Sequence, residues 1–320
     1  MVVLAATIVV AGCGAGGAST IEYPTRDIGI MAPADPGGGY DQTARLMQRA
    51  LTEGEVPEQN VEVYNVPGAS GAIGLTELVN DNAGDPHQLM VIGAILVGAI
   101  KPTDVPFDVG DTTPIARLTA EYVAIFVPAD SEYETLEQLM EDFEEDPGNI
   151  SWGGGSVGGV DQILTGQLAQ EVGVNPARVN YIPYSGGGEL TPALLSEDVT
   201  VGVSGLAEFI DQVEAGELRL LAVSSEEPIE GVDSPTIIEA GYDLSLSNWR
   251  GVVAPPDIPD EQRDKIIADI EEMHDTPQWE EALETNNWED VLLTGDEFEE
   301  YIGEQDEEIE QTLKELEVIE

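Results

Sequence analysis

Basic residues are scarce in this chain of 320 residues. It has 11 Lys plus Arg against 64 Asp plus Glu, for a formal net charge of −53 at pH 7. Nucleic acid is excluded as a natural partner, because so few cations cannot neutralise a row of phosphates. The acidic residues are spread along well-patterned segments, so we do not interpret them as disorder. They predict a surface adapted to molar salt, where the screening length is roughly 3 Å, and hence a protein of an extreme halophile.

Histidine and cysteine are almost absent. The two histidines, His87 and His274, lie far apart, and Cys13 is the only cysteine. No group of Cys, His and acidic residues has the spacing of a metal site, and neither histidine lies near a glycine-rich loop, where it could activate a serine. The sequence therefore predicts no metal, no cofactor and no catalytic residue.

Long hydrophobic runs are lacking as well. The apolar stretch that begins the chain is too short to span a bilayer and is typical of a signal peptide, although no Lys or Arg precedes Arg26. Its end at 10–13 (Val-Ala-Gly-Cys) resembles a lipobox, whose cysteine receives lipid after cleavage, and residues 14–20 follow as a small-residue tether. Residues 1–26 are predicted to anchor the protein, through lipidated Cys13, to the outer face of the cell membrane.

Glycine, in contrast, is plentiful, and it gathers where strand-like runs give way to helical patterns. One glycine-rich turn, 36–41, follows the strand-like run 27–32, and a second, 153–161, follows 149–152. Glycines at such a position leave backbone N–H groups bare at a helix N-terminus, which makes an anion site. Two such turns, about 120 residues apart, predict two lobes that each present a cradle for an anion.

The rest of the chain alternates between strand-like and helix-like runs, which predicts an α/β fold with largely parallel sheets. The expected strands are 27–32, 61–65, 88–92, 121–127, 149–152, 179–183, 199–203, 219–224 and 249–254. The expected helices are 41–51, 71–80, 135–144, 160–172, 189–195, 206–215 and 260–274. The last 45 residues are predicted to be helical throughout and to pack on a lobe through the stripe Phe298, Ile302, Ile309, Leu313 and Leu316.

Six blocks in order resemble the substrate-binding component of tripartite tricarboxylate transporters, the TctC/Bug type of extracytoplasmic solute receptor. The likeness runs from about residue 27 to the C-terminus. The blocks are Pro36-Gly37-Gly38-Gly39-Tyr40-Asp41, residues 65–74 (NVPGASGAIG), residues 155–161 (GSVGGVD), residues 183–189 (PYSGGGE), residues 220–225 (LLAVSS) and residues 248–256 (NWRGVVAPP). One position departs from the family pattern: Gln162 stands after Asp161, where a histidine is common.

The resemblance implies a two-lobed type II periplasmic-binding-protein fold with two extended crossings, at Ala120–Pro128 and Asn248–Ala254. Lobe 1 would comprise 27–122 plus 252–320, with the C-terminal helices packed on it, and lobe 2 would comprise 123–251. Ligand would bind between the lobes, at the carboxyl ends of the strands.

The family's ligand loops imply which residues contact the ligand. Backbone N–H groups at Gly37 to Gly39 would hold one carboxylate, and those at Ser156 to Gly158 another, each helix N-terminus contributing roughly 0.3–1 kcal/mol. Ser70 and Ser185 would add hydroxyl donors. The full expected set is Pro36, Gly37, Gly38, Gly39, Tyr40, Asp41, Gly68, Ala69, Ser70, Gly155, Ser156, Val157, Gly158, Asp161, Tyr184, Ser185, Gly186 and Arg250.

Three of these residues have two interpretations each. Asp41 and Asp161 lie in first helical turns, where acids are favourable, so they either stabilise the helix or bind a ligand hydroxyl. Arg250 either forms an inter-lobe salt bridge or clamps a ligand carboxylate through two parallel hydrogen bonds.

We therefore expect a monomeric receptor that captures a di- or tricarboxylate such as citrate, alone or as a metal complex, and delivers it to permease subunits. The first alternative is an NAD(P)-binding enzyme, because Gly153, Gly155 and Gly158 fit the dinucleotide fingerprint. That fingerprint needs an acidic residue at the end of the next strand, and none stands there, at Tyr184. The second alternative is a receptor that serves a membrane sensor.

Overall fold

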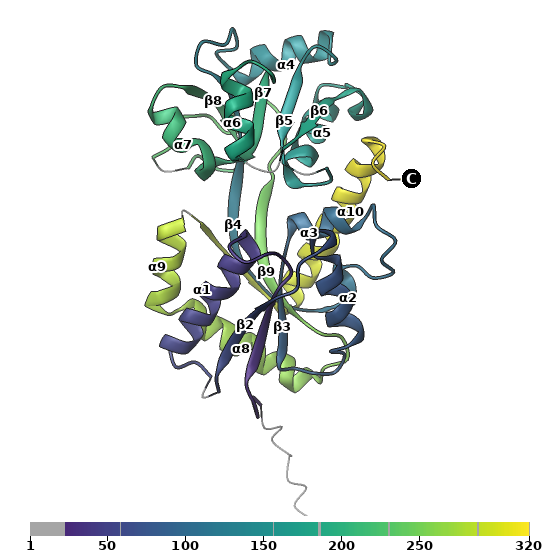
Figure 1. The fold of residues 1–320 in the computed structure, drawn as a ribbon, viewed down its shortest axis with the longest axis vertical. Helices are drawn as coiled ribbons and strands as arrows, with labels where there is room; N and C mark the ends of the chain where they lie inside the picture. The colour runs from purple at the N-terminus through teal and green to yellow at the C-terminus, as the bar shows by residue number, and fades with distance from the viewer. Residues whose placement is uncertain are drawn as a thin grey trace, which may run out of the picture.

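The protein has two α/β lobes, one above the other, joined by two long strands (Figure 1). The computed structural model describes residues 23–57, 59–155, 157–184, 187–229, 231–286 and 288–319. The predicted two-lobed periplasmic-binding-protein fold is confirmed. The lipobox and Cys13 lie outside the described residues. Within the described ranges, no helix combines the length and apolarity that a membrane crossing needs.

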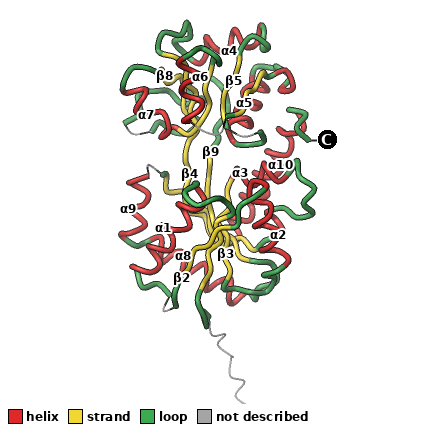
Figure 2. Tube along the Cα trace, in the orientation of Figure 1, coloured by secondary structure: helices red, strands yellow, loops and turns green. Residues whose placement is uncertain are grey.

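The two lobes contain ten strands and ten α-helices among the described residues (Figure 2). The strands are β1 (Ile28–Ala32), β2 (Val61–Asn65), β3 (Gln88–Gly93), β4 (Thr113–Pro128), β5 (Ser151–Gly154), β6 (Asn180–Pro183), β7 (Val201–Gly205), β8 (Leu218–Val223), β9 (Ser247–Ala254) and β10 (Glu289–Thr294). The helices are α1 (Gly39–Glu53), α2 (Ala72–Asn80), α3 (Ala94–Ile100), α4 (Leu136–Glu145), α5 (Val160–Glu171), α6 (Gly187–Leu195), α7 (Leu206–Glu214), α8 (Asp260–His274), α9 (Pro277–Asn286) and α10 (Gly295–Glu315).

Strand β4 belongs to both sheets. Its first half pairs with β9 and β10 in lobe 1, and its second half pairs with β7 and β8 in lobe 2. The exchange of partners falls between Tyr122 and Val123, next to the boundary that the sequence places at 122. The residue boundaries of the lobes stay a prediction.

Strand directions turn the carboxyl edges of the two sheets toward each other. In lobe 1, β1 is parallel to β2 and β3, β3 is antiparallel to β9, and β9 is antiparallel to β4. β4 therefore leaves lobe 1 in the direction of β1 to β3. In lobe 2, β4 is antiparallel to β7, which is parallel to β5, and β5 is parallel to β6. The loops that follow β5, β6 and β7 thus face those that follow β1, β2 and β3.

Two apolar layers cover the lobe 1 sheet, because alternate residues of its buried strands point to opposite faces. In β1, Ile30 packs with Met47 of α1 and Ile270 of α8, whereas Met31 packs with Leu75 of α2. The layer that contains Met31 continues into lobe 2, as far as Trp152.

Helix α10 extends beyond the lobe on which it begins (Figure 1). At its start, Phe298 packs edge-on against Trp249 of β9. At its end, Leu316 lies against Gly166 of α5 in lobe 2, and Gln167 of α5 donates a hydrogen bond to Glu308 at 2.7 Å. The predicted apolar stripe is confirmed as a packing surface, but it contacts both lobes.

The expectation that the last 45 residues are helical throughout is wrong. β10 lies within them and pairs antiparallel with β4. Its sequence, EDVLLT, holds three consecutive aliphatic residues, a run too short for periodicity to distinguish strand from helix. The segment is a strand because it pairs with β4, and that pairing joins residues about 170 positions apart.

Candidate functional site

The predicted site residues follow the carboxyl ends of two pairs of parallel strands, β1 with β2 and β5 with β6, apart from Arg250, which lies within β9. Residues 36–41 follow β1 and open α1, and Gly68, Ala69 and Ser70 follow β2. Gly155, Val157, Gly158 and Asp161 follow β5, and Tyr184 follows β6. Three further predicted residues, Ser156, Ser185 and Gly186, lie outside the described residues. The two sets of loops therefore lie on the facing edges of the two sheets.

The helix starts at α1 and α5 have the same local design. The N-cap residues, Gly38 and Gly159, have nearly identical backbone angles, with φ of −78° and −79° and ψ of 170° and 169°. An aspartate in each first turn accepts a hydrogen bond from a loop amide. Asp41 accepts from Gly37 N–H at 2.8 Å, and Asp161 accepts from Gly155 N–H at 2.7 Å. These contacts favour the structural interpretation of both aspartates.

The surroundings of Asp41 stabilise its charge. Arg45, one turn further along α1, donates from Nε to Oδ2 at 2.9 Å, and Asn65 Nδ2 donates to Oδ1 at 2.8 Å. The hydrogen bond from Arg45 is the main cause that lowers the pKa of Asp41 to about 2. Asp41 is therefore ionised throughout the neutral range, and it ties the loop after β1 to the end of β2.

Asp161 has the opposite electrostatic setting. Burial raises its pKa to about 7, the Gly155 N–H opposes that shift, and the charge of Glu208 on α7 adds to it. Tyr181 lies beside it and donates its hydroxyl proton to the Gly155 carbonyl at 2.9 Å. Near neutral pH this carboxyl is therefore divided between its protonated and ionised forms.

Several loop amides are already occupied by side chains of the protein. Besides Gly37 and Gly155, the Gly158 N–H donates to Gln162 Oε1 at 2.7 Å. The Gly38 N–H donates to the Asp35 carbonyl at 3.3 Å. The expectation that the amides of Gly37, Gly38 and Gly158 stand free for a ligand is therefore not met in this structure. Within the described part of the chain, the amides of Gly39 and Tyr40, in the first turn of α1, have no hydrogen-bond acceptor.

Arg250 forms an ion pair across the two crossing strands. Its Nη1 and Nη2 each donate to one carboxylate oxygen of Glu121 on β4, both at 3.0 Å. Trp288 Nε1–H donates to the same carboxylate at 2.6 Å, and the Arg250 guanidinium carbon lies 5.3 Å from the centre of a Trp288 ring. The salt bridge that the sequence suggested for Arg250 is therefore present in the structure. It uses two of the five guanidinium N–H donors, so three remain for other partners.

The first residue of α1 lies directly against this ion pair. A Cβ built on Gly39 would come within 2.7 Å of Arg250 Nη2. Glycine at 39 therefore provides the space that the Arg250 side chain occupies. It also brings a cationic side chain next to the free amides at the start of α1.

A cavity of about 820 Å³ opens beside Arg250 and between the lobes. Lobe 1 contributes α1, α9 and the segment 288–290, and lobe 2 contributes α7 together with Ile229, Gly231 and Val232. Of the residues predicted from sequence, Gly39 and Arg250 line it. The described residues predicted from the β5 and β6 loops, Gly155, Val157, Gly158, Asp161 and Tyr184, follow the facing edge but do not line this cavity.

On the side of α3 the lobes are in contact. A Cβ on Gly98 of α3 would lie 2.5 Å from the carbonyl oxygen of Gly158 and 3.2 Å from Ile163 of α5. Tyr40 connects the start of α1 to the same helix, because its hydroxyl accepts the Leu96 N–H at 2.9 Å. The lobes are therefore closed along α3, α5 and α10, and this cavity lies along α7 and α9.

Sequence reasoning missed Glu121 and Trp288, which both contact Arg250. Glu121 stands in a segment correctly expected to cross between the lobes, so an acidic residue there, opposite an arginine on the second crossing, was a usable signal. Trp288 stands between α9 and β10, where no motif points to it.

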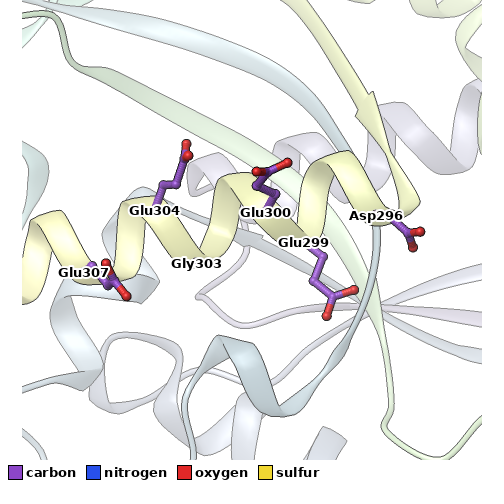
Figure 3. Close-up of a pocket in the computed structure, with 6 residues that line it drawn as sticks. All are labelled: Asp296, Glu299, Glu300, Gly303, Glu304 and Glu307. Carbon is purple, nitrogen blue, oxygen red and sulfur yellow. The ribbon is translucent and has the colours of Figure 1, made fainter.

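Away from the cavity, the exposed face of α10 carries a group of acidic side chains, which project to both sides of the helix (Figure 3). The labelled residues are Asp296, Glu299, Glu300, Gly303, Glu304 and Glu307. In the parts of the chain that the structure describes, no three acidic, His or Cys groups converge as metal ligands. We interpret this face as solvated acidic surface.

The sequence matches known proteins along most of its length. The family model described as "Tripartite tricarboxylate transporter family receptor" matches residues 44–318. Protein BugT of Bordetella pertussis is 26% identical over 293 residues, which make up 90% of this chain and 88% of that protein.

Solved structures with the same fold include ligand complexes. A TctC solute binding protein from Polaromonas has a TM-score of 0.80 and 26% identity, over 92% of this chain and 100% of its own. MatC from Rhodopseudomonas palustris with bound malate has a TM-score of 0.67 and 21% identity, over 93% of this chain and 100% of its own. An R. palustris protein with adipate has a TM-score of 0.74 and 20% identity, over 92% of this chain and 99% of its own. At such identities the last two show likeness of fold alone.

The family model covers most of the chain, and the overall fold is similar to that of a solved TctC solute binding protein. This chain belongs to the tripartite tricarboxylate transporter family of receptors.

Proposed function

We propose that this receptor captures a small organic carboxylate between its lobes and delivers it to the permease subunits of a tripartite transporter. The family and the fold support the receptor role. One observation supports a carboxylate as the ligand. A buried arginine, Arg250, lies next to the unbonded amides at the start of α1, beside the interlobe cavity. A cation and a helix N-terminus both stabilise a carboxylate.

The other predicted site residues keep supporting roles in this proposal. Pro36, Gly38 and Gly68 shape the two lobe 1 loops, and the loops after β5 and β6 are proposed to contact the ligand from lobe 2. Ser70, Ser156 and Ser185 are proposed hydroxyl donors. Asp41 and Asp161 hold the loops in place.

The cellular setting belongs to the same proposal. The N-terminal lipobox supports attachment to the outer face of the membrane through Cys13, with the receptor acting there as a monomer. Two solved proteins of similar fold contain malate and adipate, which supports an acid of a few carbons. Citrate fits the cavity less well, because acidic side chains are numerous in its wall.

A thermal-shift screen tests the ligand class. The mature protein with Cys13→Ser would be heated in about 2–3 M KCl, a salt range chosen for its strong screening, with citrate, succinate, malate, adipate, glutamate and NAD. A ligand at 100 times its dissociation constant stabilises the fold by about 2.7 kcal/mol. We expect at least one carboxylate to raise the melting temperature. A response to NAD alone would overturn the receptor in favour of a nucleotide-binding protein.

Two loop variants locate the site. Gly38→Pro and Gly158→Pro each remove an amide and distort a loop, so we expect weaker binding of whichever acid the screen identifies. Unchanged affinity in both variants would show that the ligand does not contact these loops.

A further inference from the structure

We propose that Trp288 is a positioning residue for the ligand: it holds the guanidinium of Arg250 in the orientation in which a ligand carboxylate meets it. This inference rests on the proposed function, in which Arg250 contacts the carboxylate, and it adds a second residue to that site. Its basis is that Trp288 contacts both members of the ion pair between Arg250 and Glu121.

Trp288 differs in its surroundings from the other three tryptophans of the chain. Trp152, Trp249 and Trp279 pack within the apolar cores, and among the described residues their Nε1–H groups have no hydrogen-bond partner. Trp288 is equally buried, but it belongs to none of the apolar clusters and lines the interlobe cavity. Its Nε1–H donates to Glu121 at 2.6 Å. This tryptophan therefore packs on an ion pair rather than in a core.

The sheet of lobe 1 places Trp288 and Arg250 on opposite sides of Glu121. Ala120, the residue before Glu121, pairs with β9 on one side and with β10 on the other. Arg250 belongs to β9, and Trp288 directly precedes β10. The backbone N–H of Trp288 also donates to the carbonyl of Leu283 in α9 at 3.0 Å. The ring is thus attached to a backbone that is fixed both by α9 and by β10.

Three groups surround the guanidinium of Arg250. Glu121 accepts from Nη1 and Nη2, both at 3.0 Å, and these two parallel bonds fix the direction in which the guanidinium points. The tilt of its plane is restricted by the Trp288 ring, whose centre lies 5.3 Å from Cζ, and by Gly39, where a Cβ would come within 2.7 Å of Nη2. The donors that Glu121 leaves free are therefore held in one orientation beside the first turn of α1.

This restraint bears on affinity because an arginine side chain is long and has many rotamers. A ligand that had to immobilise Arg250 itself would bind less tightly by the rotamer freedom lost. Glu121 alone is a weak restraint, because 27% of its side chain is exposed and solvated ion pairs contribute little. The cation–π contact with Trp288 is stronger, since the side chain of Arg250 is only 8% exposed.

Two substitutions of Trp288 test this role. Affinities for citrate, succinate, malate, adipate and glutamate would be measured by titration calorimetry on the same protein as in the thermal-shift screen. Trp288→Leu should weaken every acid that binds by about tenfold, the scale of one cation–π contact at a desolvated site. Trp288→Phe keeps a ring but loses the N–H, so it should weaken them by only about threefold. This milder variant carries the test if Trp288→Leu does not fold.

Tyr301 on α10 offers a matched control. Its ring lies beneath another guanidinium of lobe 1, with its centre 4.2 Å from Cζ of Arg117, and it does not line the cavity. Tyr301→Leu removes the same kind of contact. It should lower the free energy of unfolding and leave the affinity for each acid unchanged.

Nuclear magnetic resonance separates positioning from general packing. In the ligand-free protein, relaxation of the arginine Nε–H groups reports how firmly each guanidinium is held. Trp288→Leu should lower the order parameter of Arg250, and Trp288→Phe should lower it less. The order parameter of Arg219, whose guanidinium donates to three backbone carbonyls in lobe 2, should stay the same in both variants.

The outcomes distinguish this inference from the proposed function. Wild-type affinity in both Trp288 variants would overturn the inference and leave the carboxylate receptor standing. An equal loss of affinity in Trp288→Leu and Tyr301→Leu would do the same, as would a loss of affinity with the order parameter of Arg250 unchanged. If none of the five acids bound the wild-type protein, the proposed function would fail, and this inference with it.

Discussion

At the scale of single residues, Asp41 and Asp161 both lie in the first turn of a helix and have opposite electrostatic roles. Both accept a loop amide at the start of a helix, but only Asp41 has an arginine as its partner. The pKa of Asp41 falls from 3.8 to about 2, so its contribution to stability is present above pH 3.8 and is lost as the pH falls through about 2. The pKa of Asp161 rises from 3.8 to about 7, so the fold loses stability as the pH rises from 3.8 to about 7.

The two asparagine variants should therefore change stability in opposite directions at pH 8. Asp41→Asn removes a paired charge and should destabilise the protein. Asp161→Asn keeps an acceptor for Gly155 N–H and removes a buried charge, so it should stabilise the protein by a few kcal/mol at pH 8 and by little at pH 4. Denaturant unfolding at a series of pH values measures both, with the wild type as the common reference. A loss of stability at pH 8 in Asp161→Asn would contradict the assignment.

Gly39 and Gly38 give a second matched pair. A methyl group at 39 would meet Arg250 Nη2 at 2.7 Å, whereas at Gly38 the nearest atom is 3.5 Å away and φ is −78°. Gly39→Ala should displace Arg250 from Glu121 and weaken carboxylate binding by about tenfold, the equivalent of one charge-assisted hydrogen bond. Gly38→Ala should bind as the wild type does. Titration of both variants with the same acid decides the matter, and equal affinities would exclude Arg250 from the site.

At the scale of elements, α10 connects the lobes on the side where α3 and α5 meet. Gly98 allows that contact, because a Cβ there would overlap the Gly158 carbonyl. Gly98→Ala should separate the lobes, lower the melting temperature and increase the radius of gyration in small-angle scattering. The control is Gly303→Ala on the exposed face of α10, where a Cβ meets nothing within 4 Å. It should raise stability by about 0.5–1 kcal/mol. A Gly98→Ala protein as compact and stable as the wild type would rule out this role for the contact.

Sequence patterns predicted most elements because their signals are local. The glycine-rich turns marked the starts of α1 and α5, and the apolar stripe of α10 was correctly expected to be buried. What the sequence could not supply are partners distant along the chain. Glu121 and Arg250 are 129 positions apart, and Trp288 is 167 positions from Glu121. The hydrogen bond from the Gly158 amide to Gln162 depends on the rotamer of the Gln162 side chain, which no sequence motif predicts.

At the scale of the whole molecule, the net charge of −53 sets the conditions under which the fold is stable. Self-repulsion among surface carboxylates weakens as salt shortens the screening length from about 10 Å at 0.1 M to about 3 Å at 1 M. The melting temperature should therefore rise steadily with KCl concentration. Sucrose at equal osmolality is the control, because it stabilises compact states without screening charge. An equal rise in sucrose would contradict an electrostatic origin.

Strand β4 has a further consequence for how the molecule unfolds. Because it pairs with two strands in each lobe, neither lobe can lose its sheet without exposing backbone groups of the other. The two halves therefore form a single cooperative unit, although they have separate sheets. The amide protons of β4 should be among the last to exchange with deuterium, and partial unfolding should begin at the edges, in β2 and β6.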